Sequence, residues 1–411
     1  MKKFASFFAV FLFITLFAVA SEAGDRNIPV EVAQLTDSLK KQFAPDRRVA
    51  LLDVDYSFSD KNVMLRGVTT SAEAKNALLK ELARKGYAVM DCLELLPDVK
   101  GLEGKTCGII NVSVANMRVA PDFSSEMMTQ SLMGMPVRVL QRDGWVRIQT
   151  PDNYIAWVHR VGVHPVTEEE MAAWNKAEKI VVTAHYGFVY SEPNQTSQTV
   201  SDVVAGNRLK WEGSKGAFYK VTYPDGRRGY ISKSIAMPEK KWRSGLQQDA
   251  AGIIRTAHTM MGIPYLWAGT SSKGVDCSGF MRTILFMHDI IIPRDASQQA
   301  YVGEHIDIAA DFSNLQPGDL IFFGRKATPE RKERVVHVGM YIGGKRFIHS
   351  QGDVHISSFD PADELFDEYN LGRLLFATRV LPYINKEEGL NTTETNEYYN
   401  CLLYTSDAAD E

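Results

Sequence analysis

The spacing of hydrophobic and polar residues changes several times along the chain, and each change predicts a different kind of structure. In the first part, apolar residues follow strand patterns, then recur at helical spacing, and then return to a strand pattern. Ser71 precedes the helical stretch, where a hydroxyl suits the N-cap. The pattern predicts a small α+β unit over residues 24–105, with strand, strand, helix and strand at 49–54, 63–67, 72–85 and 87–95.

The middle of the chain consists of short β-rich runs separated by turn residues such as Asp143-Gly144, which is typical of small barrels. Two such stretches occur, and both end in a strand with a small, an aromatic and a β-branched residue, Ala156-Trp157-Val158 and Gly229-Tyr230-Ile231. This self-similarity predicts tandem repeats. The expected boundaries are 106–166 for the first barrel, 167–179 for a linker helix and 180–237 for the second barrel.

Beyond residue 242 the pattern changes to helices followed by strands, which predicts an α+β domain over 242–383. Its expected helices are 246–261 and 277–288, and its expected strands are 319–323, 336–342 and 345–349. From 384 the apolar periodicity is lost. We therefore expect 384–411 to be a tail that is either disordered or artefactual, since its end, CLLYTSDAADE, resembles a translated adapter sequence.

The amino terminus predicts export. Lys2 and Lys3 precede an apolar run at 4–17, and the small residues Ala18-Val19-Ala20 offer a cleavage site, with 23 as a second option. The run is too short to span a bilayer, and no cysteine follows it for a lipid anchor. We expect a periplasmic or secreted protein with a signal peptide at 1–20 and no membrane anchor.

The length, net charge and cysteines of the chain limit which functions it can have. A chain of 411 residues suits several domains, and a formal net charge of −4 does not favour nucleic acid as a partner. The four cysteines are Cys92, Cys107, Cys277 and Cys401. Cys92 and Cys107 are close enough in sequence for a disulfide, with two buried thiols as the alternative. Cys401 falls in the expected tail.

Cys277 has the setting of a nucleophile. A thiol reacts as its thiolate, which a helix N-terminus and a nearby imidazole favour. Asp276-Cys277-Ser278-Gly279 begins a predicted helix, and two predicted strands joined by a Gly343-Gly344 hairpin carry His337 and His349. One imidazole would act as base while the other orients it. The alternatives are a buried apolar cysteine with structural histidines and, with weaker support, a zinc site.

Four stretches in order, IPYLWAGTSSKGVDCSGF, IPRDASQQ, LQPGDLIFF and HVGMYIGGKRFIHS, resemble the NlpC/p60 cysteine peptidases. These are papain-like enzymes that cut bacterial cell-wall peptides, and the resemblance covers roughly 250–383. It implies a papain-like catalytic domain with Cys277 as nucleophile, His337 as general base and His349 as the polar third member. The barrels in front resemble the SH3-like domains of one subgroup.

The same resemblance implies a substrate site. Tyr265 would position the nucleophile or bind the oxyanion, and Trp267 would form a wall of the cleft. Polar side chains would bind the free amine of an N-terminal L-alanine, with a salt-bridged loop or ordinary surface residues as the alternative. These are Asp276, Ser278, Arg294 and Asp295 of the catalytic domain and Glu126 and Tyr154 of the first barrel.

Together these features predict a secreted cysteine peptidase that hydrolyses γ-D-Glu–diamino acid bonds in murein peptides with a free L-Ala. We expect a monomer that needs no metal or organic cofactor. Two other functions stay open at this stage, a non-catalytic peptidoglycan-binding protein and an acyltransferase on the same fold.

Overall fold

The computed structural model describes residues 28–400 except residue 388. The expected signal peptide and Cys401 lie outside the described residues. The chain divides into two compact units, one ending at Glu103 and one beginning at Gly104. Within the described residues, no helix is long and apolar enough to cross a membrane.

The first unit is a three-stranded sheet with two helices. β1 and β2 are antiparallel, whereas β2 and β3 are parallel. Ser71 caps α3 as predicted, because its side chain accepts a hydrogen bond from the Ala74 N–H. The sequence pattern missed α2, whose buried face consists of only three residues, Val32, Thr36 and Leu39. The elements are α2 Val30–Phe43, β1 Leu52–Ser59, β2 Asn62–Thr69, α3 Ala72–Arg84 and β3 Ala88–Leu95.

Of the two alternatives for Cys92 and Cys107, the disulfide does not form. Cys92 is an exposed thiol on β3, whereas Cys107 is buried on β4. The alternative of two buried thiols therefore holds for Cys107 only. A β3 side chain turned away from the sheet's helices stays in solvent, which the sequence spacing of the two cysteines did not reveal.

The second unit begins with a seven-stranded barrel in the order β10-β4-β7-β8-β9-β5-β6. A helix follows it, α4 Glu168–Lys176, which starts in a capping box made by Thr167 and Glu170. The barrel strands are β4 Cys107–Ile110, β5 Val114–Arg118, β6 Met127–Leu132, β7 Pro136–Asp143, β8 Trp145–Gln149, β9 Ile155–His159 and β10 Val163–Val166.

The second barrel has the strand order β13-β12-β16-β15-β14-β11-β17. Taken from its other end, this order matches that of the first barrel, with β11 to β17 in the places of β4 to β10. The two barrels therefore share one topology, as the self-similarity of their sequences predicted. The core of the second barrel includes Ile180, Val203 and Ile231. The strands are β11 Lys179–Val182, β12 Tyr186–Tyr190, β13 Thr199–Val204, β14 Arg208–Lys215, β15 Phe218–Thr222, β16 Arg228–Ser232 and β17 Ala236–Pro238.

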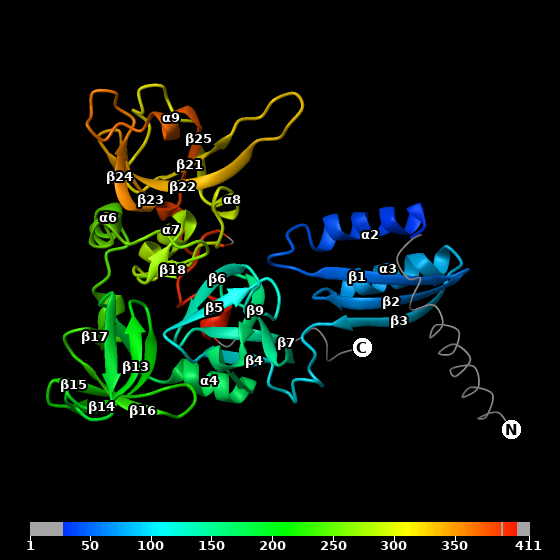
Figure 1. Cartoon of the computed structure of the whole chain (residues 1–411), viewed down its shortest axis with the longest axis horizontal. Helices are drawn as coiled ribbons and strands as arrows, with labels where there is room; N and C mark the ends of the chain where they lie inside the picture. Colours follow the sequence, from blue (N-terminus) through cyan, green and yellow to red (C-terminus); the bar gives the residue numbers. More distant parts are fainter. Residues whose placement is uncertain (1–27, 388, 401–411) are drawn as a thin grey trace. The chain divides into compact units, whose positions relative to one another are not determined.

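The last domain packs a helix, α7 Cys277–Phe286, against a six-stranded antiparallel sheet in the order β20-β25-β21-β22-β23-β24 (Figure 1). All ten residues of α7 are buried. The chain around it forms the helices α5 Glu239–Ser244, α6 Ala250–Thr259, α8 Ala296–Gln299 and α9 Glu368–Gly372 and the short strands β18 Thr270–Ser271 and β19 Gly274–Val275. The sheet strands are β20 Glu304–Ile306, β21 Leu320–Arg325, β22 Arg334–Gly343, β23 Arg346–Gln351, β24 Asp353–Ser358 and β25 Leu374–Arg379.

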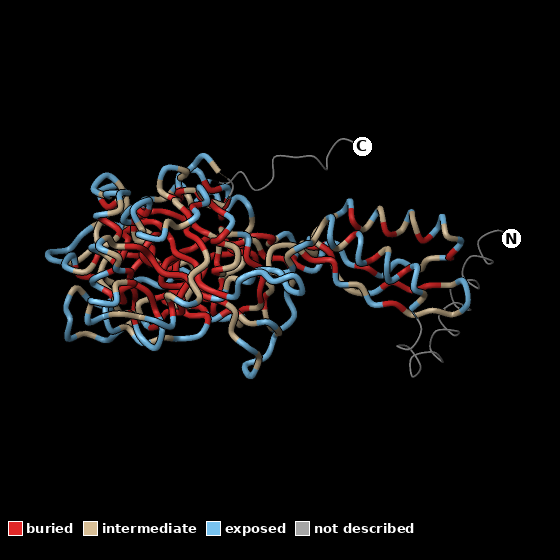
Figure 2. The backbone as a smooth tube through the Cα atoms, turned by 90° about the horizontal axis from the view of Figure 1, so that it is seen from above, coloured by how far each residue is buried: buried red, intermediate tan, exposed pale blue. Residues whose placement is uncertain are grey.

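The expected fold class is confirmed: two small all-β barrels precede an α+β domain, and a small α+β unit stands before them. In Figure 2 the buried residues run as continuous stretches through the interior of the second unit, while its loops are exposed. The core of the α+β domain joins α7 to the sheet through residues such as Phe280, Ile284 and Phe322.

The expectation of a tail without structure from residue 384 is wrong for the described part of that segment. Asn391 forms a β-bridge with Ile291, and α10 Glu397–Asn400 follows. Tyr398 is fully buried, and the Asn396 side chain donates to the Pro151 carbonyl oxygen of the first barrel. A few widely spaced anchors hold this segment, so it lacks the periodicity that a helix or strand would show.

Candidate active site

Local geometry places Cys277 at the first position of α7. Asp276 is the N-cap, and its Oδ1 accepts from the Gly279 N–H at 2.7 Å. The loop before β18 lies directly on this first turn: a Cβ added to Gly279 would stand 1.9 Å from the Gly269 carbonyl oxygen. Glycine at 279 is therefore what allows the loop to approach the nucleophile.

The Cys277 thiol faces β22. The sulfur accepts a hydrogen bond from the backbone N–H of Val338, the residue after His337. Burial raises the pKa of Cys277 to about 11, and the adjacent Asp276 carboxylate adds to the rise. The N–H groups of Val338 and Ser278 act in the opposite direction. Burial and Asp276 therefore favour the neutral thiol over the thiolate.

His337 and His349 meet on adjacent antiparallel strands, where His349 pairs with Gly339 of β22. His337 Nε2 and His349 Nδ1 are 2.8 Å apart. Burial lowers the pKa of both imidazoles, and it brings that of His349 to about 3. A neutral imidazole is a proton acceptor, which is the form that a general base needs.

Tyr265 and Trp267 lie on the loop that contacts the first turn of α7. Tyr265 joins the domain through its N–H, which donates to the Gly352 carbonyl oxygen at 2.8 Å. Burial and the nearby Cys277 and Asp276 raise the pKa of its phenol, which keeps it as a hydrogen-bond donor. Ala268 has φ +63°, and its N–H donates to Asp276 Oδ2 at 3.0 Å. The N-cap carboxylate thus also fixes the loop.

Arg294 forms the salt-bridged arrangement named above as an alternative, but with Asp276 as its close partner. Arg294 Nη2 lies 2.6 Å from Asp276 Oδ2, whereas its Nη1 lies 3.8 Å from Asp295 Oδ1. Arg294 Nη1 also donates to Ser278 Oγ at 2.9 Å. Arg294 is only 1% exposed. Arg294, Asp276 and Ser278 are buried against one another, so they contact other protein groups and do not face an open substrate site.

Two contacts join the first barrel to this site. The Tyr154 hydroxyl donates to Asp295 Oδ2 at 3.1 Å, and Trp267 Nε1 donates to Glu126 Oε1 at 3.0 Å. Trp267 is 62% exposed, so the second contact lies at the surface. The structure therefore brings together both barrel residues and two of the catalytic-domain residues that the sequence singled out.

Comparison with known proteins identifies the parts of the chain. Residues 262–372 match the NlpC/P60 family, 117–161 the bacterial dipeptidyl-peptidase Sh3 domain and 185–235 the bacterial SH3 domain. A γ-D-glutamyl-L-lysine dipeptidyl-peptidase of Bacillus cereus is 33% identical over 236 residues, which are 55% of this chain and 68% of the relative. The chain belongs to the NlpC/P60 family. With Cys277 as its candidate nucleophile, it is a cysteine peptidase.

A second relative and a solved structure support the same family. Dipeptidyl-peptidase 6 of Lysinibacillus sphaericus is 25% identical over 63% of this chain and 93% of its own length. The crystal structure of an NlpC/P60 family protein from Bacillus cereus superposes with a TM-score of 0.57, at 26% identity, over 67% of this chain and all of that one. The similarity thus extends over the SH3 domains as well as the peptidase domain.

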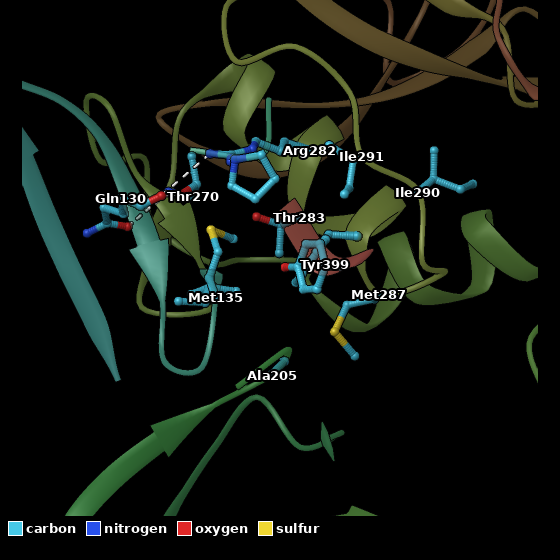
Figure 3. A pocket seen from close by; sticks show the side chains of 13 residues that line it. Gln130, Met135, Ala205, Thr270, Arg282, Thr283, Met287, Ile290, Ile291 and Tyr399 are labelled. Atoms are coloured by element: carbon cyan, nitrogen blue, oxygen red, sulfur yellow. Dashed lines mark hydrogen bonds between the residues drawn. The ribbon is translucent and has the colours of Figure 1, made fainter. Parts of the chain in front are cut away.

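Sequence reasoning missed the residues that hold the first SH3 domain to the NlpC/P60 domain. Thr129 Oγ1 accepts from Arg294 Nε at 3.0 Å. Gln130 Oε1 accepts from the Thr270 N–H at 2.9 Å, and Figure 3 shows the two residues facing each other. Thr129 and Gln130 lie on β6, an end strand of the barrel sheet, and polar residues buried on an end strand were the signal that could have revealed them.

Figure 3 shows the side chains that line a small cavity, which include Gln130 and Thr270 and lie between β6 and the end of α7. Its volume of about 20 Å³ holds one water molecule at most. The lining is mostly apolar, with Met135, Phe286 and Ile290 among its residues. The cavity is too small for a peptide, so it belongs to the packing between the first SH3 domain and the NlpC/P60 domain.

Proposed function

We propose that this NlpC/P60 peptidase hydrolyses the γ-D-glutamyl–diamino acid bond of peptidoglycan-derived peptides that carry a free N-terminal L-Ala. The observation that carries the proposal is the pair of contacts from the first SH3 domain, Tyr154 to Asp295 and Glu126 to Trp267. The printed activity of the Bacillus cereus relative, a γ-D-glutamyl-L-lysine dipeptidyl-peptidase, supports the same substrate class.

An amine pocket at this junction would draw on two carboxylates. Glu126 is exposed and Asp295 is partly buried, and each already accepts a hydrogen bond from the other domain. An ammonium group has three donors and a positive charge, which suits carboxylate acceptors. Since Arg294 is enclosed by Asp276, Ser278 and Thr129, we assign the D-Glu α-carboxylate to backbone amides instead.

In the proposed reaction, the Cys277 thiol transfers its proton to His337 as the sulfur attacks the γ-carbonyl carbon. The N–H of Cys277 at the start of α7 and the Tyr265 hydroxyl would donate to the oxyanion. His337 then protonates the departing amine of the diamino acid, which leaves a thioester on Cys277. Water, deprotonated by His337, hydrolyses the thioester and releases the L-Ala-D-Glu dipeptide.

The test uses the full-length protein with L-Ala-γ-D-Glu-meso-diaminopimelate, its L-Lys analogue and the N-acetylated form of each, followed by mass spectrometry. We expect cleavage of the free-amine peptides only, and none with Cys277→Ala. Glu126→Gln is the matched variant, because glutamine keeps the acceptor for Trp267 and removes only the charge. It should raise KM for free-amine peptides several-fold. Equal cleavage of the acetylated peptides would refute the amine requirement.

We also propose that the mature enzyme is exported and acts as a monomer. The support for export is the sequence of residues 1–23, which lie outside the described residues. Amino-terminal sequencing of protein recovered from outside the cytoplasm should begin at Ser21 or Gly24. A start at Met1 would contradict the signal peptide. Light scattering of the same sample gives the oligomeric state.

A further inference from the structure

The chain of hydrogen bonds at the active site does not end at His349. His349 Nε2 lies 3.1 Å from Ser357 Oγ on the neighbouring strand β24. The Ser357 hydroxyl in turn makes a hydrogen bond with the Asp367 carboxylate. His349 and Ser357 are both buried, whereas Asp367 is partly exposed at the start of α9. Buried groups that satisfy one another in series polarise each other.

We propose that Ser357 and Asp367 are positioning residues of the peptidase, which extend the His337–His349 pair into a directed relay ending on a negative charge. The proposal concerns how the histidines are held. It does not depend on which peptide the enzyme cleaves.

The direction of the relay follows from its two ends. An ionised carboxylate only accepts, so Ser357 donates its proton to Asp367 and its oxygen is left to accept from His349 Nε2–H. His349 then carries its proton on Nε2, and its Nδ1 must accept from His337 Nε2–H, across the 2.8 Å contact. His337 is thereby held in the tautomer whose Nδ1 is unprotonated. That nitrogen is the one able to take the thiol proton.

Asp367 is held in place independently of the relay. Its N–H donates to the Ser358 carbonyl oxygen at 2.9 Å, which ties it to the end of β24 beside Ser357. Its Oδ1 accepts from the Asn370 N–H at 2.9 Å as the N-cap of α9. Because these two hydrogen bonds already fix the Asp367 backbone and carboxylate, its bond to Ser357 costs little additional side-chain entropy.

The charged and titratable groups around His349 come from each element packed on it. His355 of β24 lies with its ring 4.4 Å from the His349 ring, and Arg373 lies at the end of α9. Both disfavour a positive charge on His349, and Asp367 is the group that favours it. Asp353 accepts from His355 Nδ1 at 2.9 Å. Asp367 therefore acts on His349 directly, and it reaches His337 only through the hydrogen bonds of the relay.

The experiment measures the rate of Cys277 alkylation by iodoacetamide against pH, with the Cys277 peptide followed by mass spectrometry so that exposed Cys92 does not interfere. No peptide substrate is involved, so failure of the proposed specificity would leave this result intact. Ser357→Ala should lower the rate at pH 7 about tenfold and move the profile to higher pH, because a hydrogen bond to a group that becomes charged is lost. Ser357→Thr, which keeps the hydroxyl, should restore most of the rate.

Asp367→Asn separates charge from capping, because asparagine caps a helix as well as aspartate does. We expect the same loss of rate with an unchanged Tm. Ser358→Ala is the matched control on the same strand: its hydroxyl accepts from the Asp360 N–H and lies outside the relay. A wild-type profile in Ser357→Ala would overturn the proposal. So would equal losses in Ser357→Ala and Ser358→Ala without a pH shift.

Discussion

Replacing Arg294 by methionine tests whether the buried ion pair with Asp276 holds the nucleophile loop. The variant keeps much of the side-chain length and removes the charge. Asp276, itself only 6% exposed, would keep the N–H donors of Gly279 and Ala268 but lose its cation. Removing one partner of a buried pair costs about 3–5 kcal/mol, because the remaining charge is uncompensated. The lost bond to Thr129 would also weaken the contact with the first SH3 domain.

The assay is urea unfolding of the full chain in a Cys277→Ala background, which avoids thiol oxidation. The reasoning predicts strong coupling with Asp276→Asn, since asparagine retains the N-cap while removing the charge that needs Arg294. The double variant should therefore recover about 2 kcal/mol or more relative to the sum of the two single variants. A cost below about 1 kcal/mol for Arg294→Met, or additive single effects, would refute the ion-pair argument.

Three further predictions concern other parts of the second unit. The free energy of unfolding should fall by up to about 1.4 kcal/mol per pH unit as pH drops from about 6.5 toward about 3. In this range His349 binds a proton in the unfolded chain but not in the folded protein, where its pKa is lowered to about 3. His349→Gln should flatten this slope in acid denaturation, and an unchanged slope would contradict the prediction. Gly279→Ala should reduce the rate of Cys277 alkylation and the Tm together, since the new methyl group would stand 1.9 Å from the Gly269 carbonyl oxygen; a wild-type rate would show that the loop moves freely. Tyr398→Ala should destabilise the protein by about 3–5 kcal/mol through loss of a fully buried aromatic ring, measured by thermal unfolding, and a negligible loss would mean that the carboxyl-terminal segment is not part of the fold.

Several expectations from the sequence failed for an identifiable reason. The carboxyl-terminal segment was expected to be unstructured because it lacks periodicity, yet Leu390 and Tyr398 are fully buried in it. Helix α2 escaped notice because its buried face is narrow. Arg294 and Asp295 were expected to bind substrate, with a salt-bridged loop as the alternative, but the close partner of Arg294 is Asp276. Adjacent residues of an extended segment point in different directions, so adjacency is a weak guide to pairing.

The sequence by itself determined what local interactions dictate. The Asp276 cap fixes the helix start at Cys277, the Gly343-Gly344 turn brings two histidine-bearing strands together, and repeated β-patterns produce two barrels of one topology. The order of the motifs around Cys277 was enough to indicate the family. Each of these features depends on residues close together in the chain, where propensity and periodicity carry information.

Only the tertiary structure decided how distant surfaces meet. Tyr154 and Asp295 are 141 positions apart, and Thr129 and Arg294 are 165 apart. The extension of the histidine pair through Ser357 to Asp367 likewise depends on how β24 and α9 pack. No local pattern encodes such contacts, because a polar residue that hydrogen-bonds across two domains has the same sequence signature as one that faces water.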